Sequence, residues 1–275
     1  MRILITLFCL LLVSCQTTQN EYALQQNDHW HRVSESQEIR IGVKKNSPPF
    51  STLTEDGQFW GFDIDMAQEI SSELGLRLKL VPLSASERIP YLKQGKVDIV
   101  IATMTQTQFR DEQVDFSVPY FKVEQGIMSL KNSEIVSFLD LYHKKVGVVE
   151  GTQSLKNVKD QQPDSSIVSF KSYNDLMEGL NNGEVDAIVS DYLILLGLLN
   201  KSPYMDKFRL DSQSSTSETY AIAVNENQSN LRDQINHSLM VLWEKNIWQD
   251  AFLTWFGEGS IYFHDSDFHI NVWAK

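Results

Sequence analysis

The chain has 275 residues, is 42% hydrophobic and carries a net charge of −12 at pH 7. This length and apolar fraction suffice for one large domain or two moderate ones. A strongly acidic chain with scattered basic residues repels phosphate backbones, so the composition argues against nucleic acid as a partner.

The first fifteen residues predict export and attachment to a lipid. Arg2 precedes an apolar run over residues 3–13 that is too short to span a bilayer comfortably. The run ends in Leu-Val-Ser-Cys, the pattern of a lipobox, in which the cysteine thiol takes a diacylglycerol before cleavage. We therefore expect a lipoprotein signal peptide over residues 1–14 and a lipidated, palmitate-bearing Cys15. The alternative is an ordinary signal peptide followed by a chance cysteine.

Cleavage before Cys15 also removes Cys9, which leaves one cysteine and no possible intrachain disulfide. It removes Arg2 as well, which changes the net charge from −12 to −13. No later apolar run approaches the length of a membrane span, so we expect a tethered but otherwise soluble chain. Gln16 in place of an aspartate favours outer-membrane sorting. The location stays open between the periplasmic side of either membrane and the surface of a cell with one membrane.

Residues 15–37 are polar, rich in Gln and Asn, and without periodicity, which predicts a flexible spacer. Strands and helices then alternate, with period-two or continuous β-rich runs followed by apolar residues three and four apart. In chain order we predict a strand at 39–43, a helix at 64–74, a strand at 76–81, a short helix at 86–93 and a strand at 97–102. This β-α-β-α-β order predicts an α/β fold with a mostly parallel sheet.

The second half of the chain repeats this plan, with strands at 145–149 and 167–170. Segments 92–100 and 180–189 match over nine or ten positions, each with a helix end, a glycine cap and a buried strand that opens with Val-Asp. Two copies of one supersecondary unit predict two similar α/β lobes. Apolar residues at helical spacing over 231–256 predict core helix rather than a cofactor site. We assign no element to the C-terminal tail, 258–275.

Eight motifs in one order carry a likeness to a known family. They are Ile41-Gly42-Val43, Pro48-Pro49-Phe50, Gly61 to Ala67, Arg88 to Leu92, Ala102 to Thr105, Phe116 to Tyr120, Gly147 to Thr152 and Trp255-Phe256-Gly257. The chain resembles the family 3 extracellular solute-binding proteins, the polar amino-acid receptors of ABC importers, over residues 38–257. The resemblance implies a two-lobed periplasmic-binding-protein fold of type II.

In such a fold the first lobe is discontinuous, and the ligand is buried when the lobes close about a hinge. We place lobe 1 at 38–124 and 218–257 and lobe 2 at 125–217. The crossings between them are expected near 122–126 and 216–220.

The resemblance also implies that Arg110 binds the ligand α-carboxylate and that Asp191 accepts the α-ammonium group. A guanidinium fork suits a carboxylate, and a zwitterion in a buried cleft needs opposite charges because an unpaired buried charge is costly. The alternative is that Arg110 lies on the surface of a short helix capped by Thr107.

Other residues in the matched motifs are expected to hold the ligand by hydroxyl and backbone groups. Thr103 and Thr105 follow a buried strand, at the edge where α/β sheets bind ligands. Thr152, Gln153 and Ser154 precede a helix, where free N–H groups can hold a carboxylate, although Thr152 alternatively serves only as a helix cap.

Side-chain selection depends on residues that differ from those of many relatives. Ser47 and Ala85 stand where aromatic rings are expected, while Phe50 and Ala102 remain at pocket positions. Lys44 and Arg88 resemble the relatives that take aspartate or glutamate. Two cations near one pocket repel each other unless an anion lies between them, so we hypothesise that they bind a side-chain carboxylate. The alternative is that both extend into solvent.

We therefore predict the non-enzymatic receptor of an ABC importer, a monomer that meets a membrane permease and needs no cofactor or metal. The histidine pairs His29/His31 and His264/His269 lie in the expected spacer and tail and are weak metal candidates. One rival function is a periplasmic dehydratase of prephenate-like acids, with Glu150 as an acid. Another is a ligand sensor presented to a membrane partner.

Overall fold

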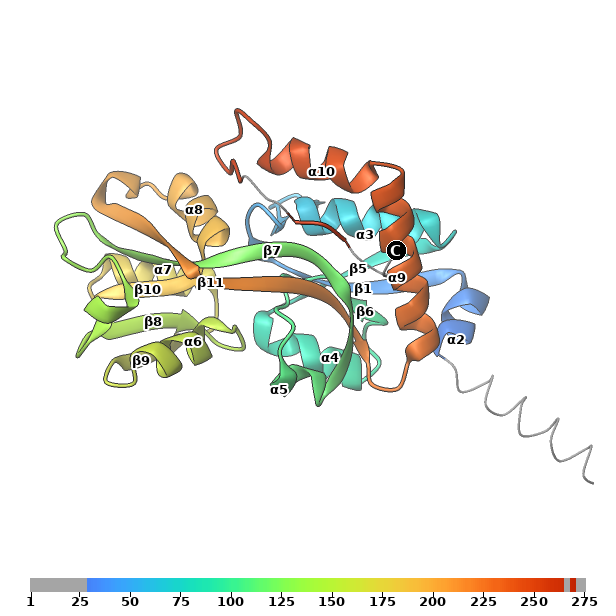
Figure 1. The fold of residues 1–275 in the computed structure, drawn as a ribbon, viewed down its shortest axis with the longest axis horizontal. Helices are drawn as coiled ribbons and strands as arrows, with labels where there is room; N and C mark the ends of the chain where they lie inside the picture. The colour runs from blue at the N-terminus through green and yellow to red at the C-terminus, as the bar shows by residue number, and fades with distance from the viewer. Residues whose placement is uncertain (1–28, 265–267, 271–275) are drawn as a thin grey trace, which may run out of the picture.

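The computed structural model describes residues 29–264 and 268–270. The predicted signal peptide, Cys15 and most of the expected spacer lie outside the described residues. Figure 1 shows two groups of helices and strands, called here the first and second lobe, which are joined by the long strands β7 (Val114–Leu130) and β11 (Phe208–Asn225). Within the described ranges, no helix combines the length and the apolar character needed to cross a membrane.

The first lobe is built from the elements before β7 together with the helices after β11. Its strands are β1 (Glu38–Lys44), β2 (Asn46–Ser47), β3 (Ser51–Leu53), β4 (Phe59–Trp60), β5 (Arg77–Leu83) and β6 (Ile99–Val100). Its helices are α2 (His29–Ser36), α3 (Phe62–Glu73), the 3-10 turn η1 (Ala85–Glu87), α4 (Arg88–Lys93), α5 (Gln108–Asp111), α9 (Ser229–Glu244) and α10 (Ile247–Phe256). Helices α3, α9 and α10 pack against one another, while α4 packs on β6 and β11.

The second lobe lies between β7 and β11 in the sequence. Its strands are β8 (Lys145–Val149), β9 (Ser166–Phe170) and β10 (Ala187–Asp191). Its helices are η2 (Phe138–Leu141), α6 (Ser154–Gln161), α7 (Tyr173–Asn181), α8 (Tyr192–Lys201) and η3 (Met205–Lys207). Helices α6 and α7 pack against β8, and α8 packs against β7 and β11.

One eight-stranded sheet runs through both lobes in the order β5-β1-β6-β11-β7-β10-β8-β9. The strands pair in parallel at its two ends, β5-β1-β6 in the first lobe and β10-β8-β9 in the second. Around β7 and β11, which carry the chain between the lobes in opposite directions, the pairing is antiparallel. The α/β prediction is therefore confirmed, and the departure from parallel pairing is confined to the connecting strands.

The repeated Val-Asp motif makes the same pair of hydrogen bonds in each lobe. Asp98 donates its N–H to Arg40 O at 2.8 Å and accepts the N–H of Arg40 on its carboxylate at 2.7 Å. Asp186 makes the equivalent bonds with Lys145, both at 2.8 Å. The motif thus joins the strand that it opens to the first strand of its own lobe, which explains why it recurs.

The last part of the expected spacer is helical, which corrects the prediction for residues 29–36. Helix α2 buries Val33 and His29, and His29 Nε2 lies 2.7 Å from Asp98 Oδ1. The His29 N–H also donates to Gln228 Oε1 at 3.0 Å. The helix is polar overall, and it is ordered by these hydrogen bonds together with Trp30 and Val33, which pack against the hydrophobic core.

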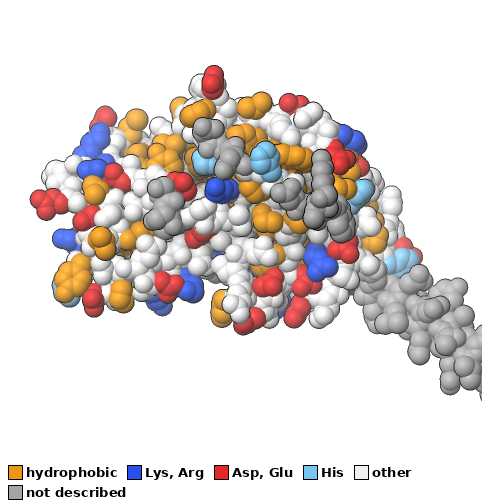
Figure 2. All heavy atoms as spheres, in the orientation of Figure 1, with side chains coloured by type: hydrophobic (Ala, Val, Ile, Leu, Met, Phe, Trp, Pro, Cys, Tyr) orange, Lys and Arg blue, Asp and Glu red, His pale blue; other side chains and the backbone are white. Residues whose placement is uncertain are grey.

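The C-terminal tail, unassigned from the sequence, covers aromatic side chains of the first lobe. The His264 ring stacks on Phe121 with ring centroids 5.9 Å apart, and Phe268 lies 5.8 Å from Trp248. Tyr262 and Ile270 are buried. On the face drawn in Figure 2, hydrophobic and histidine side chains gather over α9 and α10, while charged side chains are spread over the rest. The described part of the tail, residues 258–264 and 268–270, therefore packs on the first lobe.

Replacing Asp98 is expected to destabilise the first lobe in a pH-dependent way. Although burial acts in the opposite direction, hydrogen bonds from His29 and Arg40 lower the pKa of Asp98 to about 2. A carboxylate with a lowered pKa stabilises the fold above its unfolded pKa near 4, and this contribution, about 2 to 3 kcal/mol, is lost as the pH falls through about 2. Denaturant unfolding at pH 7 should show this loss in the free energy of unfolding of Asp98→Asn. Below pH 5 the stability of the variant should depend less on pH than that of the parent chain.

Asp186→Asn is the matched control, because the exposed Asp186 side chain accepts only the Lys145 N–H among the described residues. It should cost about 1 kcal/mol or less. Equal losses for the two variants would show that the contacts with His29 and the Arg40 side chain contribute nothing.

Candidate ligand-binding site

Most of the side chains predicted to bind a ligand lie where the two lobes meet. They come from helices α4 and α5 and from the carboxyl ends of β1 and β6 in the first lobe, and from the carboxyl ends of β8 and β10 in the second. Such strand ends are where α/β sheets commonly hold ligands. The structure brings together Lys44, Arg88, Thr103, Thr105, Arg110, Thr152 and Asp191. The described residues contain no cluster of three or more His, Cys, Asp or Glu that could hold a metal ion.

Arg88 begins α4 and is held by backbone carbonyl groups. Its Nε donates to Ala85 O at 2.9 Å, and its Nη1 donates to Ala102 O at 3.0 Å and Thr103 O at 2.9 Å. Its Nη2 reaches across to the second lobe and donates to Gly151 O at 2.8 Å. Arg88 therefore fixes the loop that follows β6 and also links the two lobes.

Arg110 converges on the same carbonyl group. It lies in α5, where Thr107 accepts the Arg110 N–H as the helix cap that the sequence predicts. Its Nη2 donates to Gly151 O at 3.0 Å and its Nη1 to Thr105 O at 2.6 Å. Burial and then the charge of Arg88 lower the pKa of Arg110 to about 9, so it remains protonated at neutral pH.

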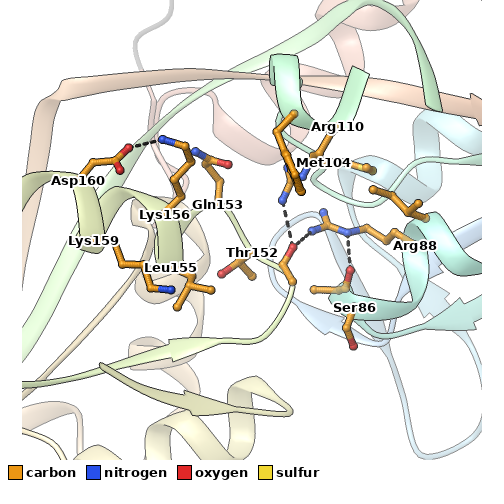
Figure 3. Close-up of a pocket in the computed structure, with 14 residues that line it drawn as sticks. Ser86, Arg88, Met104, Arg110, Thr152, Gln153, Leu155, Lys156, Lys159 and Asp160 are labelled. Atoms are coloured by element: carbon orange, nitrogen blue, oxygen red, sulfur yellow. Dashed lines mark hydrogen bonds and ion pairs between the residues drawn. The ribbon is translucent and has the colours of Figure 1, made fainter. Parts of the chain in front are cut away.

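Gly151 is a point at which the second lobe contacts both arginines of the first. Figure 3 shows the side chains of Arg88 and Arg110 pointing across the cleft at one oxygen atom, which is the carbonyl oxygen of Gly151. The Gly151 φ angle is +77°, and a Cβ atom there would lie 2.7 Å from Ser86 Cα. Both the backbone conformation and the lack of a side chain therefore make glycine necessary at this contact.

Asp191 ends β10 and is 7% exposed. Gln125 Nε2 and the Tyr220 hydroxyl donate to its two oxygens, both at 2.6 Å, from the connecting strands β7 and β11. No Lys, Arg or His of the described residues lies within ion-pair distance of it. Asp191 is thus a buried carboxylate with two neutral donors and no cation as a partner.

Lys44 ends β1 and is 3% exposed. Its Nζ lies 3.5 Å from the hydroxyl of Tyr173 and 5.2 Å from the centre of that ring, which belongs to the second lobe. The Tyr173 hydroxyl is also 3.1 Å from Ser190 Oγ. Burial, followed by the charge of Arg88, lowers the pKa of Lys44 to about 7. No carboxylate of the described residues is within ion-pair distance of Lys44.

Asp63, which the sequence analysis did not consider, positions the loop that carries Thr103. Its carboxylate accepts the Thr103 N–H at 3.0 Å and the Tyr120 hydroxyl at 2.7 Å. Thr103 has a φ of 44°, a conformation that a non-glycine residue rarely adopts without support. Burial raises the pKa of Asp63 to about 6. The aspartate of the Gly-Phe-Asp motif therefore holds the backbone of Thr103 in place without lining the cavities itself.

Glu218, also missed, lies on β11 beside the site. It accepts the Thr105 hydroxyl at 3.0 Å and Asn157 Nδ2, from the second lobe, at 2.5 Å. Burial and then the charge of Asp191 raise the pKa of Glu218 to about 7. The only sequence signal for this residue was its position within the expected crossing near 216–220.

Two hydroxyl groups among the predicted binding residues are buried and have no hydrogen-bond partner within residues 29–264 and 268–270. They are Ser47 Oγ and Thr103 Oγ1, in side chains that are 0% and 3% exposed. A buried hydroxyl group without a partner is costly, so such groups are typical of sites that a polar ligand completes.

Other predicted residues lie one layer away from the cleft. Phe50 is wholly buried, with its ring 5.0 Å from Phe121 and 5.3 Å from Tyr220, so its expected place in the pocket is corrected to the aromatic core. Ser154 donates to Gln125 Oε1 at 2.8 Å and so orients the amide that bonds Asp191. Ala102 contributes its carbonyl group to Arg88 rather than a side chain to the cleft.

Two of the cavities along the line where the lobes meet are bordered by residues that the sequence predicts to bind the ligand. The larger, of about 500 Å³, is bordered by Arg88, Arg110, Lys156 and Lys159, with Asp160 as its one acidic side chain. The smaller, of about 100 Å³, is bordered by Lys44, Lys45 and Lys171 and by no acidic side chain. Asp191 borders neither cavity, although it is close enough for its charge to act on Lys44, Arg88 and Arg110. The cleft of this acidic protein is therefore lined by cations.

Replacing Gly151 with alanine should impair the approach of the lobes while leaving each lobe folded. The added Cβ would overlap the backbone of Ala85 and Ser86, which cannot move as a flexible side chain can. Small-angle X-ray scattering should show a larger radius of gyration for Gly151→Ala than for the parent chain. The matched control is Gly183→Ala, where φ is +74° but no atom lies within 4 Å of the added Cβ. Equal radii for the parent chain and Gly151→Ala would contradict the role given to this contact.

Comparisons with known proteins agree with this geometry. The sequence model of the family described as bacterial extracellular solute-binding proteins, family 3, matches residues 39–258 of this chain. The chain is 31% identical over 264 residues to the ABC transporter glutamine-binding protein GlnH of Bacillus subtilis, a match that covers 93% of this chain and 96% of the relative.

Two solved structures share the fold. An ancestral arginine-binding protein bound to glutamine has a TM-score of 0.77 and 35% identity and covers 80% of this chain and 98% of its own. The ancestral amino acid-binding protein AncCDT-1, a precursor of cyclohexadienyl dehydratase, has a TM-score of 0.74 and 29% identity and covers 83% of this chain and 99% of its own. The expected two-lobed fold of type II is thereby confirmed. From its sequence and its fold alike, this chain belongs to the family 3 extracellular solute-binding proteins.

Proposed function

We propose that this chain is the receptor component of an ABC importer and that it binds an acidic amino acid between its lobes. One observation carries the proposal: Arg110 of the first lobe and Asp191 of the second are buried opposite charges, and neither has an ion-pair partner among the described residues. An amino-acid zwitterion supplies a carboxylate to the first and an ammonium group to the second. Such matching offsets the cost of burying each charge.

The charge of the cleft favours an acidic side chain on the ligand. Seven basic side chains and one acidic side chain border the two cavities, in a chain whose net charge is −12. Cations gathered in a cleft concentrate anions there. A ligand carboxylate beside Lys44 would also favour its protonated form, against the burial that lowers its pKa to about 7. Relatives named for glutamine or arginine therefore do not decide the ligand of this chain.

We propose a positioning role for Arg88 in place of a direct contact with the ligand side chain. All three of its nitrogen atoms donate to carbonyl groups, so we assign it to holding the loop after β6 and to meeting Gly151 on closure. Its charge still acts on an anion in the cleft. Lys44, whose side-chain amine has Tyr173 as its only hydrogen-bond partner among the described residues, is the better candidate for a direct contact with the ligand side chain.

The connecting strands suit a closure movement. β7 and β11 are paired along most of their length, and their register shifts between Gln213 and Glu218. Such an irregularity is where paired strands bend most readily. We propose that the lobes move about this part of the strands, near the crossings expected at 122–126 and 216–220, and that the closed form meets the permease.

Calorimetric titration of the mature chain tests whether the ligand is an acidic amino acid. Glutamate or aspartate should bind at least tenfold more tightly than glutamine or arginine. Arg110→Lys and Asp191→Asn should each weaken binding about 100-fold, because each leaves a ligand charge unpaired in a buried site. Arg209→Lys is the matched control, since Arg209 pairs with Asp211 on the second lobe away from the cleft.

Different outcomes separate the alternatives. Tight arginine binding without a response to glutamate would contradict the acidic preference but keep the receptor function. Release of a ring product from prephenate would instead support the dehydratase. Glu150, the acid considered for that reaction, is exposed and borders neither cavity.

The lipid tether at Cys15 is part of the proposal and lies outside the described residues. Intact mass analysis of the chain from membranes should show an N-terminus at Cys15 that carries diacylglycerol and a further acyl chain. Cys15→Ser should lack both the modification and the cleavage before residue 15. A mature chain that begins elsewhere, without lipid, would contradict the lipoprotein assignment.

A further inference from the structure

We infer that the ligand extends beyond a single amino acid and ends in a second acidic group, as an acidic dipeptide does. The inference rests on the proposed function for the inner part of the ligand. The outer part would occupy the larger cavity, called here the outer chamber, whose walls include Ile89, Met104, Phe109, Leu155, Lys156 and Lys159. Figure 3 shows the lysines and Leu155 on α6, facing Arg88 and Arg110 across the chamber.

The size of the outer chamber exceeds what the inner contacts need. Its volume of about 500 Å³ is within the range of about 300–1,000 Å³ that is typical of ligand sites, whereas the inner cavity beside Lys44 has only about 100 Å³. The lobes already touch at Gly151, where both arginines bond its carbonyl group. The chamber therefore remains open while the lobes are in contact and is available to a longer ligand.

One wall of the outer chamber is apolar and partly exposed. Phe109 of α5 is 67% exposed although it borders the chamber together with Ile89 and Met104. An exposed aromatic ring beside a cavity is typical of a surface that a ligand covers. The aliphatic carbons of a second residue would cover this ring, while a lone inner amino acid would leave it in water.

The opposite wall offers cations to a terminal carboxylate. Lys156 and Lys159 are three residues apart on α6 and so lie on one face of the helix. Lys156 pairs with Asp160, whereas Lys159 has no ion-pair partner among the described residues. A long lysine side chain at a water-accessible rim can follow a carboxylate whose position varies.

A dipeptide satisfies the inner and outer groups together. Its ammonium group would meet Asp191, the side-chain carboxylate of its inner residue would match the charges of Lys44 and Arg110, and its outer carboxylates would lie near Lys159. A fatty or aromatic acid without an ammonium group would leave Asp191 unmatched. A dipeptide with a basic outer residue would meet the cations of the chamber unfavourably.

Calorimetry of the mature chain with glutamate, Glu-Glu and Glu-Lys tests the inference. Glu-Glu should bind at least tenfold more tightly than glutamate, and Glu-Lys should gain nothing over glutamate. Lys159→Gln should weaken Glu-Glu at least tenfold and weaken glutamate much less, because Lys159 would meet the outer carboxylates directly and act on glutamate only from a distance. Lys93→Gln is the matched control, an exposed lysine of α4 that borders neither cavity. Phe109→Ser, which also alters an exposed side chain, should weaken Glu-Glu more than glutamate.

The outcomes separate this inference from the function on which it rests. If glutamate binds and Glu-Glu is no tighter, or if Lys159→Gln affects both equally, the inference is wrong and the proposed function stands. If Glu-Glu binds and glutamate does not, the inference stands and the single amino acid is the wrong ligand. If neither binds, both are wrong.

Discussion

The burial of three cations where the lobes meet, with no carboxylate in ion-pair contact, is the constraint on which the site depends. Lys44, Arg88 and Arg110 are each at most 7% exposed, and among the described residues none forms a salt bridge. Backbone carbonyl groups hold the two arginines, and carboxylates act on them only from a distance. Because buried charges are costly without a counter-ion, this arrangement favours an anion that arrives from outside and is held between the lobes.

The same contacts connect binding with closure. The carbonyl group of Gly151 reaches both arginines from the second lobe, and Asn157 reaches Glu218 from the same side. Asp191 in turn is held by Gln125 and Tyr220, which lie on the two strands that join the lobes. The four charged groups Arg88, Arg110, Asp191 and Glu218 are therefore each tied either to the opposite lobe or to the connection between lobes. A ligand that changes these contacts also changes the relative stability of the open and closed forms.

Local motifs predicted the residues whose chemistry depends on the backbone near them. Arg110 follows a capping threonine, Asp191 ends a strand, and Gly151 follows another, so each could be placed at an edge of the sheet before the fold was known. The Val-Asp repeat predicted two similar units for the same reason, because its hydrogen bonds join neighbouring strands. Phe50 was misplaced, since the choice between pocket and core depends on Phe121 and Tyr220, which are far away in the sequence. Asp63 and Glu218 were missed because their partners are equally distant.

The sequence by itself determined the α/β class, the two repeated units, the family likeness and the cationic and acidic residues at the strand ends, because period, capping and glycine turns are local properties. Only the tertiary structure decided that α2 and the tail belong to the first lobe, that Arg88 is held by carbonyl groups, and that the cleft contains a chamber larger than an amino acid requires. Burial and cavity shape arise from contacts between segments that are far apart in the chain, and no local pattern records them.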